Sequence, residues 1–135
     1  MNVAFGSDEH TALTDAVCAD LETRGHTVVR VDDGDWVDVG RAVGELVSGD
    51  ACATGVLFCW TGTGASIAAN KVPGVRAALC TDAATATGAR QWNDANVLVM
   101  GLRLTSPEVA REMLDAWFVT PVDPVEAATI ERLEA

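Results

Sequence analysis

Short apolar segments alternate along the chain with longer segments in which apolar residues recur at helical spacing. The apolar runs are rich in Val, Ala and Leu, and they occupy residues 2–6, 27–31, 55–59, 75–80 and 96–100. Each run is too short for a helix, and it lacks the alternation of a strand with one exposed face. The pattern predicts five parallel β-strands that are covered on both faces.

The segments between these runs carry helical signals. Leu13, Val17 and Leu21 repeat at four-residue intervals before a basic last turn and a glycine. Similar segments cover residues 39–47, 82–91 and 106–117. Strands that alternate with helices imply right-handed crossovers. We therefore expect a three-layer α/β/α sandwich with a Rossmann-like, five-stranded parallel sheet.

The length of 135 residues fits a single domain, which we assign to residues 1–135. After Trp117, two prolines precede a short segment with helical spacing. We expect residues 121–135 to form a tail helix that docks either on a second subunit or on its own domain.

The charge of the chain narrows the choice of partners. Nine Lys and Arg stand against twenty Asp and Glu, for a net charge of -11. Such a balance argues against a surface for nucleic acid or for anionic lipid, and makes a polyanionic substrate less favourable. No apolar run reaches the roughly 18 residues of a membrane helix, and the first residues do not resemble a secretory signal. These features predict a cytoplasmic protein with a small-molecule substrate.

Four cysteines are widely separated and form no C-x-x-C pair, which argues against a zinc site and a disulfide scaffold. They are Cys18, Cys52, Cys59 and Cys80. His and carboxylate residues show no ligand spacing either, so we expect no metal. Only Cys59 lies where chemistry is expected, at the end of a buried strand.

A glycine-rich loop follows this third predicted strand, and Gly62-Thr63-Gly64 open the next helix. A dinucleotide-binding fingerprint needs a further glycine or alanine where Ile67 stands, and no P-loop motif is present. The loop therefore predicts no nucleotide cofactor. We expect its backbone N–H groups to bind a small oxyanion such as an enediolate.

Three segments of the chain are together similar to one known family. They are Gly6-Ser7-Asp8; the run Cys59-x-Thr61-Gly62-x-Gly64-x-Ser66-Ile67-Ala68-Ala69-Asn70-Lys71 with its continuation to Cys80; and Asn93-Asp94-Ala95-Asn96-Val97-Leu98. These segments resemble the ribose-5-phosphate isomerase B and galactose-6-phosphate isomerase family. The resemblance implies a sugar-phosphate isomerase with a Rossmann-type fold, assembled as a homodimer with each site at the interface.

The resemblance also implies roles for individual residues. A cysteine at the position of Cys59 takes a proton from the carbon next to the substrate carbonyl, and Thr61 is its hydroxyl partner. The glycine loop stabilises the resulting enediolate. The candidate substrate-binding residues are Asp8, Glu9, His10, Gly62, Thr63, Gly64, Ser66, Trp92 and Asn93.

The chain departs from the family pattern at three places. The family's Asp-His pair is here Asp8-Glu9, with His10 shifted by one residue. Trp92 stands where the ring-opening histidine is expected, and Trp cannot exchange a proton with a ring oxygen. Residues 121–127 contain none of the arginines that bind phosphate across the family's dimer. Cations elsewhere that could compensate are Arg41, Arg90, Arg103 and Arg132.

These departures favour an aldose–ketose isomerase with an open-chain or non-phosphorylated sugar or hydroxy-carbonyl substrate. The same proton-abstraction site also fits another reaction, such as an epimerisation. A third hypothesis is a non-catalytic subunit that forms a heteromer with a paralogue carrying the missing groups.

Overall fold

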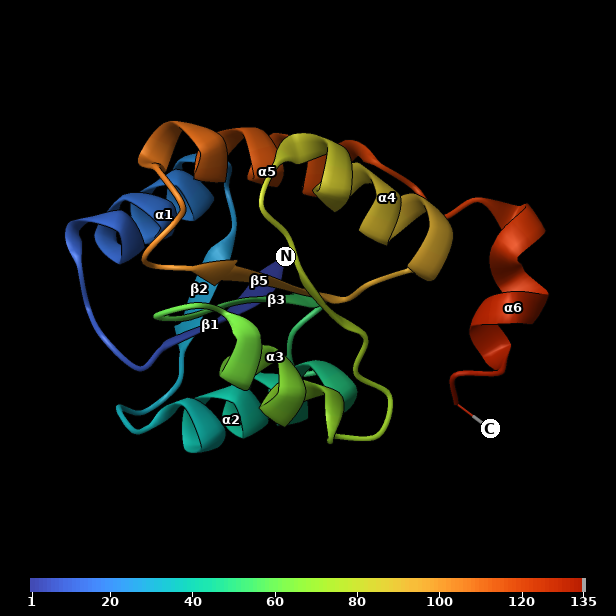
Figure 1. Cartoon of the computed structure of the whole chain (residues 1–135), viewed down its shortest axis with the longest axis horizontal. Coiled ribbons are helices and arrows are strands. Elements are labelled where there is room, and N and C mark those ends of the chain that lie inside the picture. The colour runs from blue at the N-terminus through green and yellow to red at the C-terminus, as the bar shows by residue number, and fades with distance from the viewer. Residues whose placement is uncertain (135) are drawn as a thin grey trace.

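A parallel β-sheet forms the middle layer of the computed structural model, which describes residues 1–134 (Figure 1). Its strands are β1 (Asn2–Ser7), β2 (Thr27–Arg30), β3 (Thr54–Cys59), β4 (Ala77–Leu79) and β5 (Val97–Gly101). They are ordered β2-β1-β3-β5-β4, and all neighbours run parallel. The sheet confirms the five predicted strands.

Helices cover both faces of the sheet, so the expected three layers are confirmed (Figure 1). The helices on one face are α1 (Ala12–Thr23), α4 (Ala83–Asn93) and α5 (Pro107–Val119), and those on the other are α2 (Trp36–Ser48) and α3 (Thr63–Asn70). No helix within residues 1–134 has the length and apolar character needed to cross a membrane.

Successive residues of the central strands enter opposite halves of the core. Phe58 of β3 packs with the helices α1, α4 and α5, whereas its neighbour Leu57 packs with α2 and α3. Every residue of β3 is buried, because both faces of a parallel sheet are covered in this architecture. The unalternated apolar runs in the sequence follow from this double coverage.

The edge strand β4 is shorter than the predicted run over residues 75–80. It pairs with β5 on one side only, and side chains hold the residues at its start. Asn96 accepts a hydrogen bond from the Arg76 amide at 2.8 Å, and Asn70 accepts one from the Ala77 amide at 2.8 Å. These local bonds replace ladder bonds at the start of the strand.

The tail consists of a short 3-10 helix, η1 (Pro124–Glu126), and α6 (Ala127–Glu131). It contacts its own domain through two polar links. The Asp123 amide donates to the Gln91 carbonyl at 2.8 Å, and the Glu134 carboxylate pairs with Arg76 at 2.8 Å. Docking of this tail on a second subunit stays a prediction.

Candidate active site

The crevice between β1 and β3 lies where the chain connections leave the sheet in opposite directions. Ligands of open α/β sheets bind at such a point, outside the carboxyl ends of the strands. Ser7 at the end of β1 pairs with Phe58, and Cys59 at the end of β3 pairs with Gly101. The segment after β1 and the loop after β3 therefore meet at this edge.

Cys59 is 5% exposed and is the last residue of β3. The backbone after it is fixed to the segment that follows β5. The Leu102 amide donates to the Cys59 carbonyl at 2.9 Å, and the Arg103 amide donates to the Trp60 carbonyl at 2.9 Å. The thiol thus lies at the start of a loop whose position is set by main-chain bonds.

Gly62 turns this loop into α3 with a φ of +79°, in the left-handed region that favours glycine. A Cβ added here would also lie 2.5 Å from Leu79 Cδ1 and 3.2 Å from the Gly101 nitrogen. A Cβ on Gly101 would lie 2.8 Å from the Thr61 carbonyl oxygen. The loop and the end of β5 approach so closely because neither glycine carries a side chain.

The N-terminus of α3 presents backbone N–H groups at the site. No side chain caps this helix, and the first backbone N–H groups of a helix have no helical acceptor. Ser66 differs, because its amide donates to the Gly62 carbonyl at 3.1 Å, which leaves only its hydroxyl for a ligand. The hydroxyls of Thr61 and Thr63 lie 2.7 Å apart at the same turn. This arrangement of N–H and O–H donors suits a developing oxyanion.

Trp36, the first residue of α2, forms one wall of the turn. Its indole lies against Gly64, where an added Cβ would be 2.8 Å from the ring carbon Cε3. The side chain is 44% exposed, and Trp60 on the loop itself is 56% exposed. Trp36 therefore lies beside the donors of α3, and Trp60 precedes them in the loop.

The segment after β1 brings carboxylates to the same edge. Partial burial is the main reason why the pKa of Asp8 is raised; a backbone hydrogen bond opposes the rise, and the charges of Glu9 and Asp35 add to it. His10 lies 2.7 Å through its Nε2 atom from Asp33 Oδ1, and both side chains are exposed. The rim of the crevice is consequently acidic.

Trp92 and Asn93 lie at the opposite end of the sheet. They end α4, which starts near the carboxyl end of β4 and runs back to the amino end of β5 (Figure 1). On β5, Val97 pairs with the start of β3, and Gly101 pairs with Cys59. These four steps along the strand correspond to about 13 Å. One chain therefore does not bring these two residues together with the thiol.

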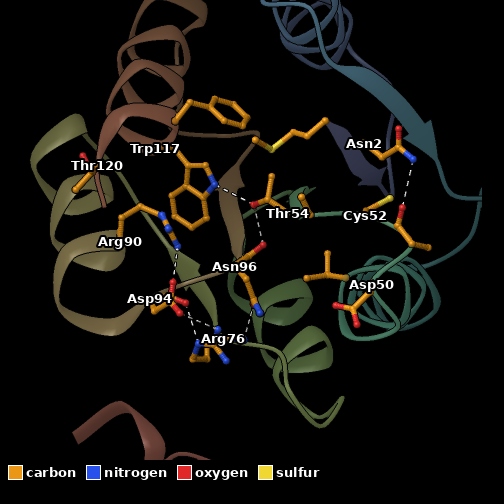
Figure 2. A pocket seen from close by; sticks show the side chains of 15 residues that line it. Asn2, Asp50, Cys52, Thr54, Arg76, Arg90, Asp94, Asn96, Trp117 and Thr120 are labelled. Atoms are coloured by element: carbon orange, nitrogen blue, oxygen red, sulfur yellow. Dashed lines mark hydrogen bonds and ion pairs between the residues drawn. The ribbon is translucent and has the colours of Figure 1, made fainter. Parts of the chain in front are cut away.

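A pocket of about 750 Å³ lies at this amino end of the sheet (Figure 2). Asp94 joins two partly buried arginines there: its Oδ1 accepts from Arg90 at 3.0 Å, and its backbone carbonyl accepts from Arg76 at 2.8 Å. The indole N–H of Trp117 donates to Thr54 Oγ1 at 3.0 Å. Sequence analysis missed this pocket, because the linear pattern does not indicate that Arg76 and Arg90 meet at Asp94.

Within residues 1–134, no three His, Cys, Asp or Glu side chains are placed to hold a metal ion. Burial disfavours the thiolate form of the other three cysteines. Burial raises the pKa of Cys80 to about 12, with a further contribution from Asp82, and burial is also the main cause of the raised pKa of Cys18 and of Cys52.

Comparison with known proteins identifies the family of the chain. Residues 3–134 match the family described as Ribose/Galactose Isomerase. The chain is 39% identical over 124 residues to ribose-5-phosphate isomerase B of Escherichia coli, covering 85% of this chain and 81% of the relative. It is 33% identical over 124 residues to D-erythrulose-4-phosphate isomerase of Pectobacterium atrosepticum, covering 87% and 82%.

Among solved structures, ribose-5-phosphate isomerase B of Clostridium thermocellum superposes with a TM-score of 0.94 at 33% identity. The superposition covers 99% of this chain and 95% of that one. Sequence and fold agree over almost the whole length, and the chain belongs to the ribose/galactose isomerase family of sugar-phosphate isomerases.

Proposed function

We propose that the protein is an aldose–ketose isomerase that moves a proton between adjacent carbons of an open-chain sugar derivative, with Cys59 as the base. The observation that carries the proposal is the position of this thiol at the end of β3, directly before the uncapped N-terminus of α3. A base and an oxyanion site are the two parts that an enediolate mechanism requires.

In the proposed reaction, the thiolate of Cys59 removes the proton from the carbon next to the carbonyl. The electron pair of the broken C–H bond forms a carbon–carbon double bond, and the carbonyl oxygen becomes an oxyanion. The N–H groups of Thr63 and Gly64 stabilise this oxygen, and the Thr61 hydroxyl supports the thiol. Return of the proton to the neighbouring carbon completes the exchange of aldose and ketose.

The departures from the family pattern bear on the substrate. Trp92 cannot exchange a proton, so we propose a substrate that needs no ring opening. A four-carbon sugar phosphorylated on its last carbon cannot close a five-membered ring, because no free hydroxyl is suitably placed. The similarity to a protein named D-erythrulose-4-phosphate isomerase supports this substrate class. Non-phosphorylated hydroxy-carbonyl compounds are the alternative.

Arg103 is our candidate for an anion contact on the substrate. Its backbone is bonded to the Trp60 carbonyl, so the residue follows the loop at the carboxyl edge. The negative charges of Glu9 and Asp35 act on Asp8 at this edge, which makes a cation beside the loop more important for a phosphorylated substrate.

We further propose that the complete site needs a second copy of the chain. Trp92 and Asn93 lie at the amino end of the sheet and Cys59 at the carboxyl end, so one substrate touches both only if two chains contribute. A homodimer is the simplest arrangement. A heteromer with a paralogue would supply the same groups from a different chain.

Proton exchange in deuterated water tests the reaction. The purified protein is offered D-erythrulose 4-phosphate, erythrulose and ribose 5-phosphate, and deuterium incorporation next to the carbonyl is followed by NMR. We expect incorporation with the first compound, and its loss in Cys59→Ala but not in a Cys52→Ala control. Incorporation that survives in Cys59→Ala would contradict the role of this base, and no incorporation with any substrate would favour the non-catalytic subunit.

A further inference from the structure

The pocket at the amino end of the sheet is separate from the crevice beside Cys59. It lies where the first residue of β3 meets the last turns of α4 and α5, and its volume of about 750 Å³ is in the range of small-molecule sites (Figure 2). Thr54, which lines the pocket, and Cys59 are the two ends of β3. Five steps along a strand correspond to about 17 Å, so a small ligand in this pocket does not touch the thiol.

Arg90 brings an available hydrogen-bonding edge to this pocket. Its guanidinium uses one nitrogen, Nη1, for the bonds to Asp94 Oδ1 and to the Ala95 carbonyl. Within residues 1–134, its Nε and Nη2 atoms make no hydrogen bond, although the side chain is only 21% exposed. The N–H groups on this edge of a guanidinium are parallel and fit two oxygens of a phosphate or a carboxylate. Arg90 is therefore anchored by one nitrogen and can bind an oxyanion with the other two.

The protein itself fixes the position of this guanidinium. Its central carbon lies 5.6 Å from the centre of the Trp117 ring, which is buried. The indole N–H donates to Thr54 Oγ1 at 3.0 Å, and that hydroxyl donates to the Asn96 carbonyl at 2.8 Å. Because the arginine is already ordered, a ligand that binds to it loses less free energy in immobilising the side chain.

The charges around the pocket favour an anion at Arg90. Arg76 bonds to the carbonyl and the carboxylate of Asp94 and pairs with Glu134, so its charge is balanced by two carboxylates. Asp50 also lines the pocket, but on the side away from Arg90 (Figure 2). The pocket thus offers paired donors on one side and a carboxylate acceptor on the other. An anion that carries hydroxyl groups along its carbon chain matches both sides.

We propose that this pocket binds a small polyhydroxylated anion, a sugar phosphate or a sugar acid, through the Nε and Nη2 edge of Arg90. Two oxygens of the anionic group accept from this edge, and a hydroxyl group of the ligand donates to the Asp50 carboxylate. The site is independent of the proposed reaction, because it shares no residue with the crevice at the other end of the sheet.

The indole N–H signals of the four tryptophans show where a ligand binds. The ¹⁵N-labelled protein is titrated with D-sorbitol 6-phosphate, with D-gluconate and with neutral D-sorbitol, none of which is an aldose or a ketose. Single Trp→Phe variants assign the signals. We expect the anions to shift the Trp117 signal and sorbitol to leave it in place; a response to one anion alone supports the site and identifies its anionic group. Shifts confined to Trp36 or Trp60 would place the anions in the crevice and overturn the proposal, as would the absence of any shift.

Arg90→Lys is the sharpest variant, because it keeps the positive charge but removes the paired donors. We expect the dissociation constant of the better-binding anion to rise about tenfold. The matched control is Arg111→Lys, an exposed position on α5, which should leave this constant unchanged. Thermal unfolding checks that each variant is folded.

Asp50→Gly tests the other side of the pocket without touching the arginine. Asp50 has a φ of +62°, so glycine suits its backbone while removing the acceptor. We expect the affinity to fall about threefold. This variant keeps the proposal testable if Arg90→Lys does not fold. Unchanged affinity in the folded variants would overturn the assignment of the pocket.

Discussion

The indole of Trp36 packs directly on Gly64, so that the first residue of α2 lies on the second residue of α3. The contact joins two helices on the same face of the sheet and forms a wall beside the exposed N–H groups of α3. Because Gly64 has no side chain, the Trp36 ring can lie against it. For the same reason its backbone faces the crevice without a side chain in the way.

Gly64→Ala should therefore disturb the wall. The new methyl group would come within 2.8 Å of the Trp36 ring, and overpacking of this kind lowers the free energy of unfolding by about 1–3 kcal/mol. Urea unfolding measures the loss. In a Trp36→Ala background the same substitution should be nearly neutral or stabilising; an equal loss in both backgrounds would show that the ring is not the cause.

Truncation of the Asp94 side chain should lower the free energy of unfolding by more than its partial exposure suggests. Asp94→Ala removes an acceptor shared by two arginines and places alanine in a left-handed conformation, so we expect the free energy of unfolding to fall by about 2–3 kcal/mol. Asp94→Gly relieves the backbone and should lose less, and Asp94→Asn should lose least. Thermal unfolding of the three variants would contradict this account if their order were reversed.

His26 should make the stability of the protein depend on pH. Burial is the main cause of its lowered pKa, and the amino group of Met1 and the Arg24 guanidinium lower it further; its ring stacks on Phe118 at 4.3 Å. Because the folded state disfavours the protonated ring, stability is complete above the unfolded pKa of 6.5 and falls as the pH drops below it.

Urea midpoints from about pH 7.5 to about pH 5.5 measure this dependence. His26→Phe retains an aromatic ring against Phe118 but cannot titrate, so its midpoints should fall less steeply with decreasing pH. Identical slopes for the two proteins would assign the effect to other groups.

Trp92→His should extend the range of substrates toward sugars that form rings. A histidine exchanges protons near neutral pH, as ring opening requires, whereas the indole of Trp92 cannot. We expect a gain of turnover with ribose 5-phosphate and a higher KM for D-erythrulose 4-phosphate, both measured by coupled assay or NMR. No change in the ratio of the two kcat/KM values would show that residue 92 does not select the substrate.

The layers of the fold were predictable from the sequence because burial on both faces leaves uninterrupted apolar runs, as in β3 between Thr54 and Cys59. The glycine loop was predictable because its residue types follow from backbone geometry, as the φ of Gly62 confirms. Contacts between distant side chains were not. Nothing in the local pattern indicates that Trp36 lies on Gly64.

The separation of Asn93 from Cys59 within one chain was also hidden in the linear pattern. It follows from the length and direction of α4, which carries its last residues to the far end of the sheet. The pairing of His10 with Asp33 depends in the same way on how two exposed loops meet. The roles of the candidate site residues stay predictions that the experiments above address.

The glycine-to-backbone contacts at Gly62 and Gly101 have an evolutionary consequence. They fix the backbone of the loop through the main chain, so the neighbouring side chain of Trp60 is free to vary without moving the groups that would stabilise an enediolate. Side chains around the loop can then be substituted one at a time while the backbone of the loop keeps its position. A family built in this way can diversify in what it accepts long before it loses the ability to react.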